Sequence, residues 1–273
     1  MRTPLPRSTP QNPRDYVQSL ERGLAVIRSF GGNLELSLSQ VAAQAGITRA
    51  AARRFLITLE QLGYVGHTGQ AYRLLPRTLE LGYSFLSSQP LPQLVQPHLQ
   101  KLAYDLDDSC GVTVLDGDHV VYIARITINR LVGARLSVGS RLPAYCTAGG
   151  RVLLGSLDEK QLAEYLRTAR LSKLAPKTLV DRSALRTEVL RGRKQGWYIT
   201  DQQIEPGVRS VAAPLHDAQG NMVAAINVSS YSTRVTLQTL QKKFVPRVLS
   251  AARAIESEMH ASVVPSILSR KKP

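Results

Sequence analysis

An α+β protein in two parts is the fold class that the sequence predicts, and three observations carry the prediction. Residues 38–62 have the apolar spacing of a short helix, a tight turn and a longer helix. From Ser109 onward the hydrophobic pattern changes to the period of two that strands show, and helical spacing returns between groups of strands. The length of 273 residues suits two domains, and a hydrophobic content of 43% is enough for a packed core.

Residues 38–62 predict two crossed helices with Gly46 at the turn between them. Ser39 and Thr48 are the predicted N-caps, because a hydroxyl at the start of a helix can accept a backbone N–H. The second helix has apolar side chains at steps of three and four residues, which predicts a stripe that faces the core. These side chains are Ala52, Phe55, Leu56, Leu59 and Leu62.

The opposite face of the second helix carries Arg53 and Arg54. A helix crossed in this way can enter the major groove of DNA with its first residues against base edges, where arginine bonds guanine or phosphate. An ordinary helical hairpin with a solvated charged face has the same spacing, so the next segment matters. Tyr64–Gly66 and Gln70–Leu74 predict two short strands around His67–Gly69, as in the wing of a winged helix.

A third helix is predicted upstream and would close the small core, through Leu20, Leu24, Val26, Ile27 and Phe30. We therefore expect a winged helix-turn-helix over residues 16–76. The residues expected to contact DNA lie at the helix starts, on the arginine face and in the wing. They are Ser39, Gln40, Thr48, Arg49, Ala50, Arg53, Arg54, His67 and Arg73.

The composition favours an anionic partner without locating it. The net charge is +15 and the pI is about 10.2. The excess is spread over the chain: ten arginines face five acidic residues in 1–90, and 22 basic residues face 15 acidic ones in 91–260. No apolar run approaches the roughly 20 residues that span a bilayer, so no membrane partner is expected.

The two ends of the chain are expected to lie outside the folded parts. Residues 1–15 are rich in Pro, Ser, Thr and Asn and lack the apolar region of a signal peptide, which predicts a disordered arm. Residues 261–273 form a basic tail. Cys110 and Cys146 do not make a disulfide framework, and a cytoplasmic protein is expected.

Residues 77–90 are expected to link the two parts through a helix over Thr78–Ser88. That helix would have a broad apolar surface and therefore needs a partner, for which another subunit is one candidate. The apolar residues are Leu79, Leu81, Tyr83, Phe85 and Leu86. Gln89–Pro92 breaks the helix, and another is predicted over residues 93–107.

Residues 91–260 predict helices packed on a mainly antiparallel sheet, as in a sensor-like α+β domain. The expected strands are Gly111–Leu115, His119–Ile126, Leu131–Val138, Tyr198–Thr200, Val211–His216 and Met222–Val228. The expected helices are Gly149–Ser156, Glu159–Arg167, Arg182–Gln195 and Val235–His260, the last with a kink at Pro246.

Four segments carry a family resemblance: SLERGLAVIRSF (19–30), GITRAAARRFLITLEQLGY (46–64), LSVGSRLPAYCTAGGRVLL (136–154) and GWYITDQQIEPGVRSVAAPLHDAQGNMVAAINVSS (196–230). With the order of the parts, they resemble IclR-type transcriptional regulators over residues 16–260. RGLAVI, TRAAARR, YRLLPRTLELG and GSRLPAYCTA resemble the branch that controls aromatic-acid catabolism through the β-ketoadipate pathway.

The resemblance implies a homodimer or homotetramer on palindromic, double-stranded promoter DNA. It also implies a GAF-like C-terminal domain that binds a small organic acid: an aromatic acid such as 4-hydroxybenzoate or protocatechuate, or β-ketoadipate. Motif position implies a pocket at Gly149 and Gly150, in the loop after RLPAY, with Thr200, Ser210, Asn227 and Ser229. The chain departs from the family at Gln202–Gln203, often an acidic pair, and at Ser210, where the family has cysteine or a small residue.

The residues themselves favour an anion site in the same region. No Asp or Glu occurs between Asp118 and Asp158, whereas five arginines do: Arg125, Arg130, Arg135, Arg141 and Arg151. Arginine can hold a carboxylate through two bonds, so Arg125 and Arg141 are expected to bind the effector. The alternative is that most of these arginines are solvated.

Three other functions remain open from the residues alone. A nucleophilic Cys146 or Cys110 would make an enzyme, but the five histidines show no catalytic signature, so no catalytic residue is expected. The same residues lack paired metal-ligand spacing, so neither a metal nor a cofactor is expected. The helix–turn–helix could also contact protein only. The interpretation we favour is a two-state switch, in which an acid shifts the dimer geometry and the linker helix changes the spacing of the recognition helices.

Overall fold

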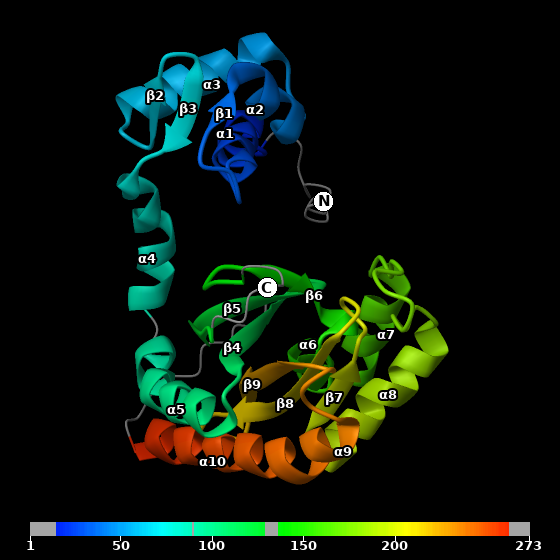
Figure 1. Cartoon of the computed structure of the whole chain (residues 1–273). Coiled ribbons are helices and arrows are strands. Elements are labelled where there is room, and N and C mark those ends of the chain that lie inside the picture. Colours follow the sequence, from blue (N-terminus) through cyan, green and yellow to red (C-terminus); the bar gives the residue numbers. More distant parts are fainter. Residues whose placement is uncertain (1–14, 89, 129–135, 262–273) are drawn as a thin grey trace. The chain divides into compact units, whose positions relative to one another are not determined.

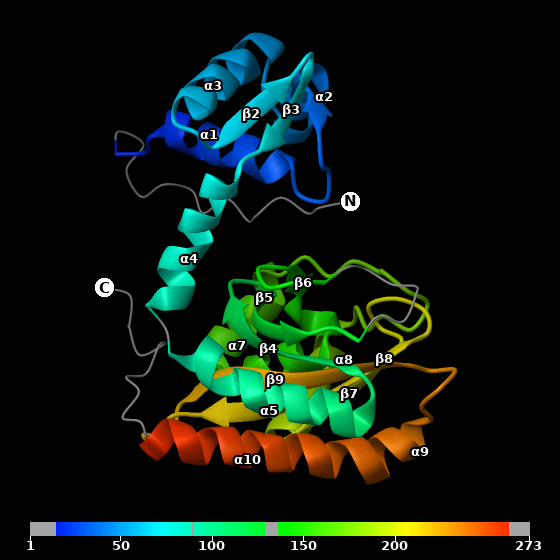
Figure 2. The same cartoon turned by 60° about the vertical axis from the view of Figure 1, so that its left-hand side comes forward.

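A computed structural model describes residues 15–88, 90–128 and 136–261 (Figures 1 and 2). The chain forms two compact units, with the boundary between Ser84 and Phe85. All but the last residue of the predicted arm, all but the first residue of the predicted tail, and most of the predicted strand Leu131–Val138 lie outside the described residues. Ala261, the first residue of the predicted tail, ends α10.

The first unit is a three-helix core with a small antiparallel sheet, as the sequence predicts. Its helices are α1 (Gln18–Ser29), α2 (Leu38–Ala45) and α3 (Arg49–Gln61). Its strands are β1 (Leu36–Ser37), β2 (Val65–Thr68) and β3 (Ala71–Leu74), in the order β1-β3-β2. The hairpin turns at Gly69–Gln70, one step later than predicted, and Gly69 has a φ of +62°.

The core of this unit confirms most of the predicted apolar stripes. Val26, Phe30 and Leu56 are buried. Leu20 and Leu24, however, are 62% and 39% exposed, so the start of α1 does not face the core of its own unit. Leu62 is also exposed, because it caps α3 beyond the last full turn.

The two helix starts differ in how well the sequence predicts them. The Thr48 hydroxyl accepts the Ala51 N–H at 3.2 Å, as predicted for an N-cap. The prediction of Ser39 as the other N-cap is wrong, since α2 begins at Leu38. Ser37 and Gln40 cap it reciprocally: the Ser37 N–H donates to Gln40 Oε1 at 2.8 Å, and Gln40 N–H to the Ser37 hydroxyl at 3.4 Å. The two-residue strand β1 puts Ser37 in the extended conformation that an N-cap needs.

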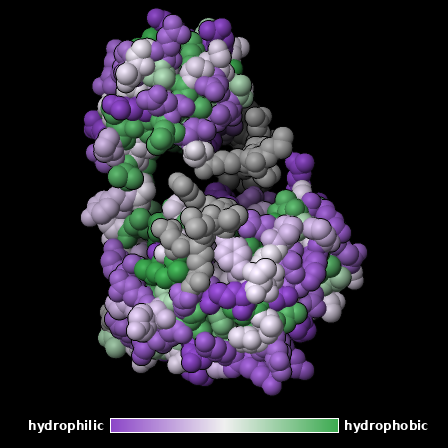
Figure 3. Space-filling view, in the orientation of Figure 1, coloured by the Kyte–Doolittle hydropathy of each residue, from purple (hydrophilic) through white to green (hydrophobic). Residues whose placement is uncertain are grey.

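The predicted linker helix is present as α4 (Leu79–Ser87), preceded by the 3₁₀ turn η1 (Pro76–Thr78). Its side chains at Leu79 and Tyr83 are 75% and 69% exposed. Apolar residues are visible along it in Figure 3. Helix α5 (Leu91–Leu106) begins two residues earlier than predicted, because Pro92 lies in its first turn, where no N–H is needed.

The second unit is built on a six-stranded antiparallel sheet with the order β6-β5-β4-β9-β8-β7. The strands are β4 (Ser109–Asp116), β5 (His119–Ile126), β6 (Arg141–Pro143), β7 (Tyr198–Asp201), β8 (Val208–His216) and β9 (Met222–Tyr231). The pairing of β5 with β6 was not predicted, and the described part of the expected strand Leu131–Val138, residues 136–138, is not in a strand.

Helices cover both faces of this sheet and enclose two apolar cores (Figures 1 and 2). Helices α5 and α10 (Val245–Ala261) lie side by side on one face. Helix α6 (Ala148–Leu154) packs on the other, with α7 (Glu159–Thr168) and α8 (Arg182–Gln195) beyond it. Trp197, the single tryptophan of the chain, is partly buried against the α5–α10 core.

The C-terminal helical region is not one regular helix. The short helix α9 (Leu237–Thr239) leads into a π-helical turn, Leu240–Phe244, and then into α10. Pro246 follows this turn. Because proline lacks the N–H that bonds back four residues, the predicted kink takes the form of a widened turn. No helix of the described residues is long and apolar enough to cross a membrane.

Candidate functional site

The first candidate surface is the outer face of α3 with the wing. All nine residues expected to contact DNA are exposed. Arg49, Arg53 and Arg54 follow the start of α3 at helical spacing, and α3 has a single acidic residue, Glu60. This face therefore offers guanidinium groups at a helix N-terminus, where backbone N–H groups also favour phosphate.

The wing is attached to α3 by its histidine. His67 on β2 lies within hydrogen-bonding distance of the Glu60 carboxylate through Nδ1, and its ring lies 6.0 Å from that of Tyr72. His67 thus holds the wing against α3 with one nitrogen. Arg73 on β3 is exposed, which suits a phosphate contact.

The second candidate site is a cavity in the second unit that encloses about 180 Å³. Strand register brings its hydroxyl groups into one row: Thr200 on β7 lies opposite Ser210 on β8, which lies opposite Ser229 on β9. The Ser210 and Ser229 hydroxyls are 2.9 Å apart. Asn227 is two residues before Ser229 and faces the same side. The polar groups that motif position implies for the pocket therefore come from three strands, with Thr200, Ser210 and Ser229 in register and Asn227 on the same face of β9.

Tyr122 on β5 was not predicted, and its ring forms the floor beside this row. A Cβ at Gly111 would lie 2.8 Å from that ring, so only glycine leaves room for it. The Asn227 amide donates to the Tyr122 hydroxyl at 3.2 Å. Gly111 pairs with Arg125 and Tyr122 with Thr113, so a glycine within a strand, next to an aromatic residue of the neighbouring strand, was the signal that could have located this ring.

Arg125 lies over the same ring, with its guanidinium carbon 4.9 Å from the ring centre. Its Nε and Nη1 atoms are buried and bond to nothing in the described chain. The Oδ1 atom of Asn227 is also buried without a hydrogen bond. Buried polar atoms almost always have partners, so these groups together fit a ligand with a carboxylate and a hydroxyl donor.

The walls and the charges of the cavity fit the same ligand. Val120, Leu142 and Ile204 give it apolar walls. Asp108 and Glu205 also line the cavity, and Arg234 donates to the Asp108 carboxylate. Arg125 is the cation among the described lining residues. A small acid with an apolar body can bind this cation and the apolar walls.

Gly149 and Gly150 lie in the first turn of α6, as the helix predicted over Gly149–Ser156 indicates, and not in the loop that the motif position implies. Gly149 lines the cavity, and a Cβ there would lie 2.7 Å from the Thr113 hydroxyl. Gly150 does not line it. A Cβ at Gly150 would lie 2.1 Å from the Ala144 carbonyl oxygen, so this glycine allows α6 to approach the preceding 3₁₀ turn.

Two further arginines of this stretch, Arg141 and Arg151, do not line the cavity, so the expectation that Arg141 binds the effector is wrong. Arg141 pairs with Asp116 at the end of the β4–β5 hairpin, where both side chains are solvent-accessible. Arg151 is fully buried and donates to the Tyr145 carbonyl, the Tyr198 hydroxyl and the Gln203 side chain. Arg130 and Arg135 lie outside the described residues.

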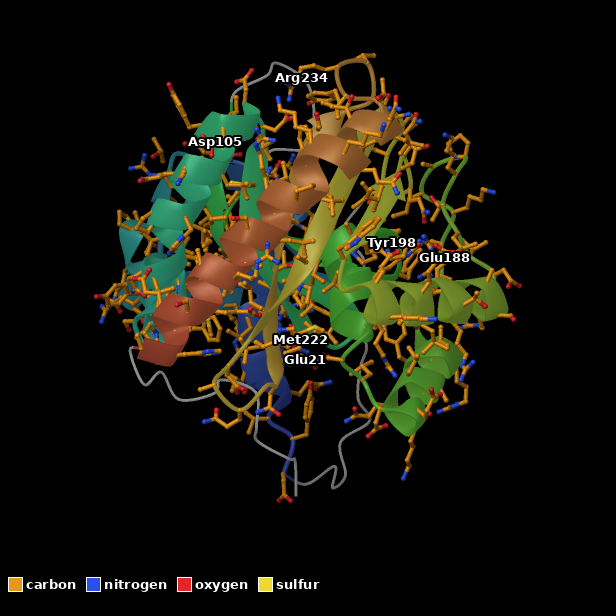
Figure 4. The ribbon with its side chains drawn as sticks, turned by 90° about the horizontal axis from the view of Figure 1, so that it is seen from below. Glu21, Asp105, Glu188, Tyr198, Met222 and Arg234 are labelled. Carbon is orange, nitrogen blue, oxygen red and sulfur yellow. The ribbon has the colours of Figure 1, made fainter. Side chains whose placement is uncertain are left out.

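Arg151 explains the departure at Gln203. Its guanidinium is stabilised by the Tyr198 ring, 4.9 Å away, and Tyr198 in turn donates to Glu188 (Figure 4). The negative charge near Arg151 is therefore that of Glu188, which is bonded to Tyr198 and not to Arg151 itself. A neutral side chain at position 203 is then enough to accept the remaining hydrogen bond of Arg151. Gln203 also anchors the segment that brings Ile204 and Glu205 to the cavity.

The two cysteines are not set up as nucleophiles. Burial raises the pKa of the Cys146 thiol, which lines the cavity, to about 12. Burial likewise raises the pKa of Cys110 to about 12. Thiolate, not thiol, is the reactive form, so both remain inert hydrophobic groups near neutral pH. Among the described residues, no three His, Cys, Asp or Glu side chains are grouped to hold a metal.

Comparison with protein families gives a match for each of the two units. Residues 19–69 match the IclR helix-turn-helix domain. Residues 83–257 match the C-terminal domain of bacterial transcriptional regulator IclR. The chain belongs to the IclR family. IclR proteins are transcriptional regulators, so the expectation of a regulator rather than an enzyme is confirmed.

Individual relatives agree with this membership. The Pca regulon regulatory protein of Pseudomonas putida is 44% identical over 241 residues, 88% of this chain and 83% of that protein. A putative transcriptional regulator from Rhodococcus sp. RHA1 has a TM-score of 0.80 at 44% identity, over 91% of this chain and 100% of that one. The resemblance to the aromatic-acid branch of the IclR family is confirmed.

A third relative was solved with an aromatic acid. It is the inducer-binding domain of the PobR transcription factor from Acinetobacter, a double mutant in complex with 3-hydroxybenzoic acid. It is 30% identical with a TM-score of 0.58, and the match covers 60% of this IclR chain and 97% of that one.

Proposed function

We propose that this IclR protein controls genes of aromatic catabolism by binding palindromic promoter DNA and responding to a small carboxylic acid. Residues 16–76 bind the DNA, residues 77–90 link the units, and residues 91–260 bind the acid. The residues proposed to contact DNA are Ser39, Gln40, Thr48, Arg49, Ala50, Arg53, Arg54, His67 and Arg73. A regulator with this role works in the cytoplasm.

The observation that carries the effector proposal is the pair of unbonded, buried nitrogens of Arg125. Each of them offers a charged donor to an anionic ligand in a site with little competing water. Tyr122, Ser210, Ser229 and Asn227 then hold a ring hydroxyl, and Thr200 and Gly149 complete the wall. The aromatic acid bound to the PobR inducer-binding domain supports this ligand class. β-Ketoadipate is the competing candidate.

The protein acts as a homodimer or a homotetramer. The exposed apolar side chains of α4 support this assembly, because an exposed apolar surface on a helix indicates a contact with another protein surface. Binding of the acid favours one dimer geometry, and α4 converts that preference into a change in recognition-helix spacing.

The deciding experiment is a thermal-unfolding series with 4-hydroxybenzoate, protocatechuate and β-ketoadipate. A ligand held by Arg125 stabilises the native state by mass action. The matched control is 4-hydroxybenzyl alcohol, which keeps the ring and hydroxyl but lacks the carboxylate. Equal shifts for acid and alcohol would contradict the role of Arg125, and no shift with any acid would contradict the ligand class.

A further inference from the structure

The start of the linker helix is bonded directly to the end of the recognition helix. The Arg77 guanidinium donates through Nη1 to the Leu62 carbonyl at 2.9 Å. Leu62 is the C-cap of α3, and the last carbonyls of a helix lack partners within it. Arg77 therefore closes the carboxyl end of α3 from 15 residues further along the chain, where a cation also suits the helix dipole.

Three further contacts hold this arginine in place. Its Nε donates to Glu80 in the first turn of α4 at 3.4 Å. Its guanidinium carbon lies 5.5 Å from the centre of the Tyr64 ring. Gly63, with a φ of +77°, passes beside the side chain, and a Cβ there would lie 3.6 Å from two Arg77 atoms. One guanidinium thus connects α3, the segment after it, and α4.

The neighbouring residue makes a second connection of the same kind. The Thr78 hydroxyl donates to the Tyr64 carbonyl at 3.1 Å, and the Leu75 N–H donates to the same oxygen at 2.9 Å. Together, Leu62, Tyr64, Arg77, Thr78 and Glu80 form what we call the α3–α4 joint. All five belong to the first unit, so the joint is internal to it.

We propose that Arg77 is a positioning residue that makes α3 and the first turns of α4 one rigid lever, so that a rotation of α4 turns the recognition helix. This rests on the proposed function. It follows that α4 can flex only beyond Glu80, towards Ser84 and Phe85, and that the junction between the wing and the linker does not flex. Arg77 acts on coupling and makes no contact with acid or operator.

The test measures the operator response of Arg77→Ala in the full-length protein. The probe is a duplex that the wild type selects from random sequences, with affinity measured without acid and with 4-hydroxybenzoate, protocatechuate or β-ketoadipate. Allosteric coupling is commonly about 5- to 150-fold. We expect the ratio of affinities to fall at least threefold, because losing one hydrogen bond is worth about a fivefold change. Acid binding to the second unit stays unchanged.

Two variants control for a general loss of stability. Thr78→Val removes the second connection with little change of shape and is expected to lower the ratio as well. Arg167→Ala removes another exposed arginine with a glutamate three residues away, on α7, and leaves the ratio unchanged. An Arg77→Ala protein that binds operator more weakly in both states, with the ratio intact, would overturn the proposal.

Hydrogen exchange separates this proposal from the proposed function. Without any acid, Arg77→Ala is expected to speed amide exchange in the last turn of α3 at least threefold relative to wild type. Unchanged exchange there would refute the joint even if no acid affects the wild type. If exchange rises while the wild type responds to none of the acids, the proposed effector class fails and the joint stands.

Discussion

The arginines on α3 are exposed to solvent, whereas the arginine in the cavity has buried nitrogens, and this difference determines how each binds its partner. Arg49, Arg53 and Arg54 are exposed and solvated, and any one of them can shift without disturbing its neighbours. Arg125 is fixed over Tyr122 with two buried nitrogens unbonded. Interactions of exposed charges are weak and screened by salt, whereas a buried charge without partners is costly until a ligand arrives. Binding at the α3 surface thus depends on how many arginines contact the partner, whereas binding in the cavity depends on the position of one arginine.

The largest effect on stability is expected at Gly150, where a side chain would have the least room. A methyl group at this position would clash with the Ala144 carbonyl, so Gly150→Ala is expected to destabilise the second unit by about 3 kcal/mol. Thermal unfolding measures this loss. Gly82→Ala is the matched control: it lies in helix α4 with nothing within 4 Å, and it should keep or slightly raise stability. Equal stability of the two variants would show that the contact between α6 and the preceding 3₁₀ turn is less rigid than its geometry indicates.

Arg125→Met should change ligand binding and stability in opposite directions. Charge-assisted hydrogen bonds contribute about 1.5–3 kcal/mol, so calorimetry should show acid binding at least tenfold weaker. The unliganded protein should unfold at a higher temperature, because two buried nitrogens without hydrogen-bond partners are gone. Arg141→Met, whose arginine is paired with Asp116 outside the cavity, should show neither change. A lower unfolding temperature for unliganded Arg125→Met would contradict the unpaired state.

Single substitutions on the exposed face should cost less. Arg53→Ala and Arg54→Ala are each expected to weaken operator binding by about 1–3 kcal/mol if the side chain reads a base. A phosphate contact would instead lower the salt slope of binding by about one. Titrations at several salt concentrations distinguish the two. If both variants bind the operator as tightly as the wild type, the assignment of α3 to the major groove is wrong.

The smallest effect concerns acid stability at Asp201, on β7. Burial alone would raise the pKa of this carboxyl, but hydrogen bonds from Lys177 and Arg209 outweigh it and lower the pKa to about 2. The resulting stabilisation is complete above the ordinary aspartate pKa near 4 and is lost as the pH falls towards 2. Asp201→Asn should therefore reduce the difference between unfolding temperatures at pH 6 and pH 3. An unchanged difference would show that these bonds add nothing to stability.

Sequence patterns predicted the exposed region better than the buried one. Helix periodicity and capping located α3, because surface and core faces alternate along one helix. The cavity depends instead on contacts between segments distant in sequence. Arg125 and Arg141 look alike in a run of arginines without acids, and only strand register and the β4–β5 hairpin separate the one over Tyr122 from the one beside Asp116. For the same reason, Gly150 and Gly149 look equivalent in sequence and differ in contacts.

Trp197 allows the unfolding of the second unit to be followed separately by fluorescence. It is the only tryptophan in the chain, and it packs against the α5–α10 core of the second unit. Intrinsic tryptophan emission therefore follows the unfolding of the effector domain, whereas far-ultraviolet circular dichroism follows the helices of both units. Coincident transitions would mean that the units unfold as one cooperative system, and separate transitions would give the stability of each without cutting the chain.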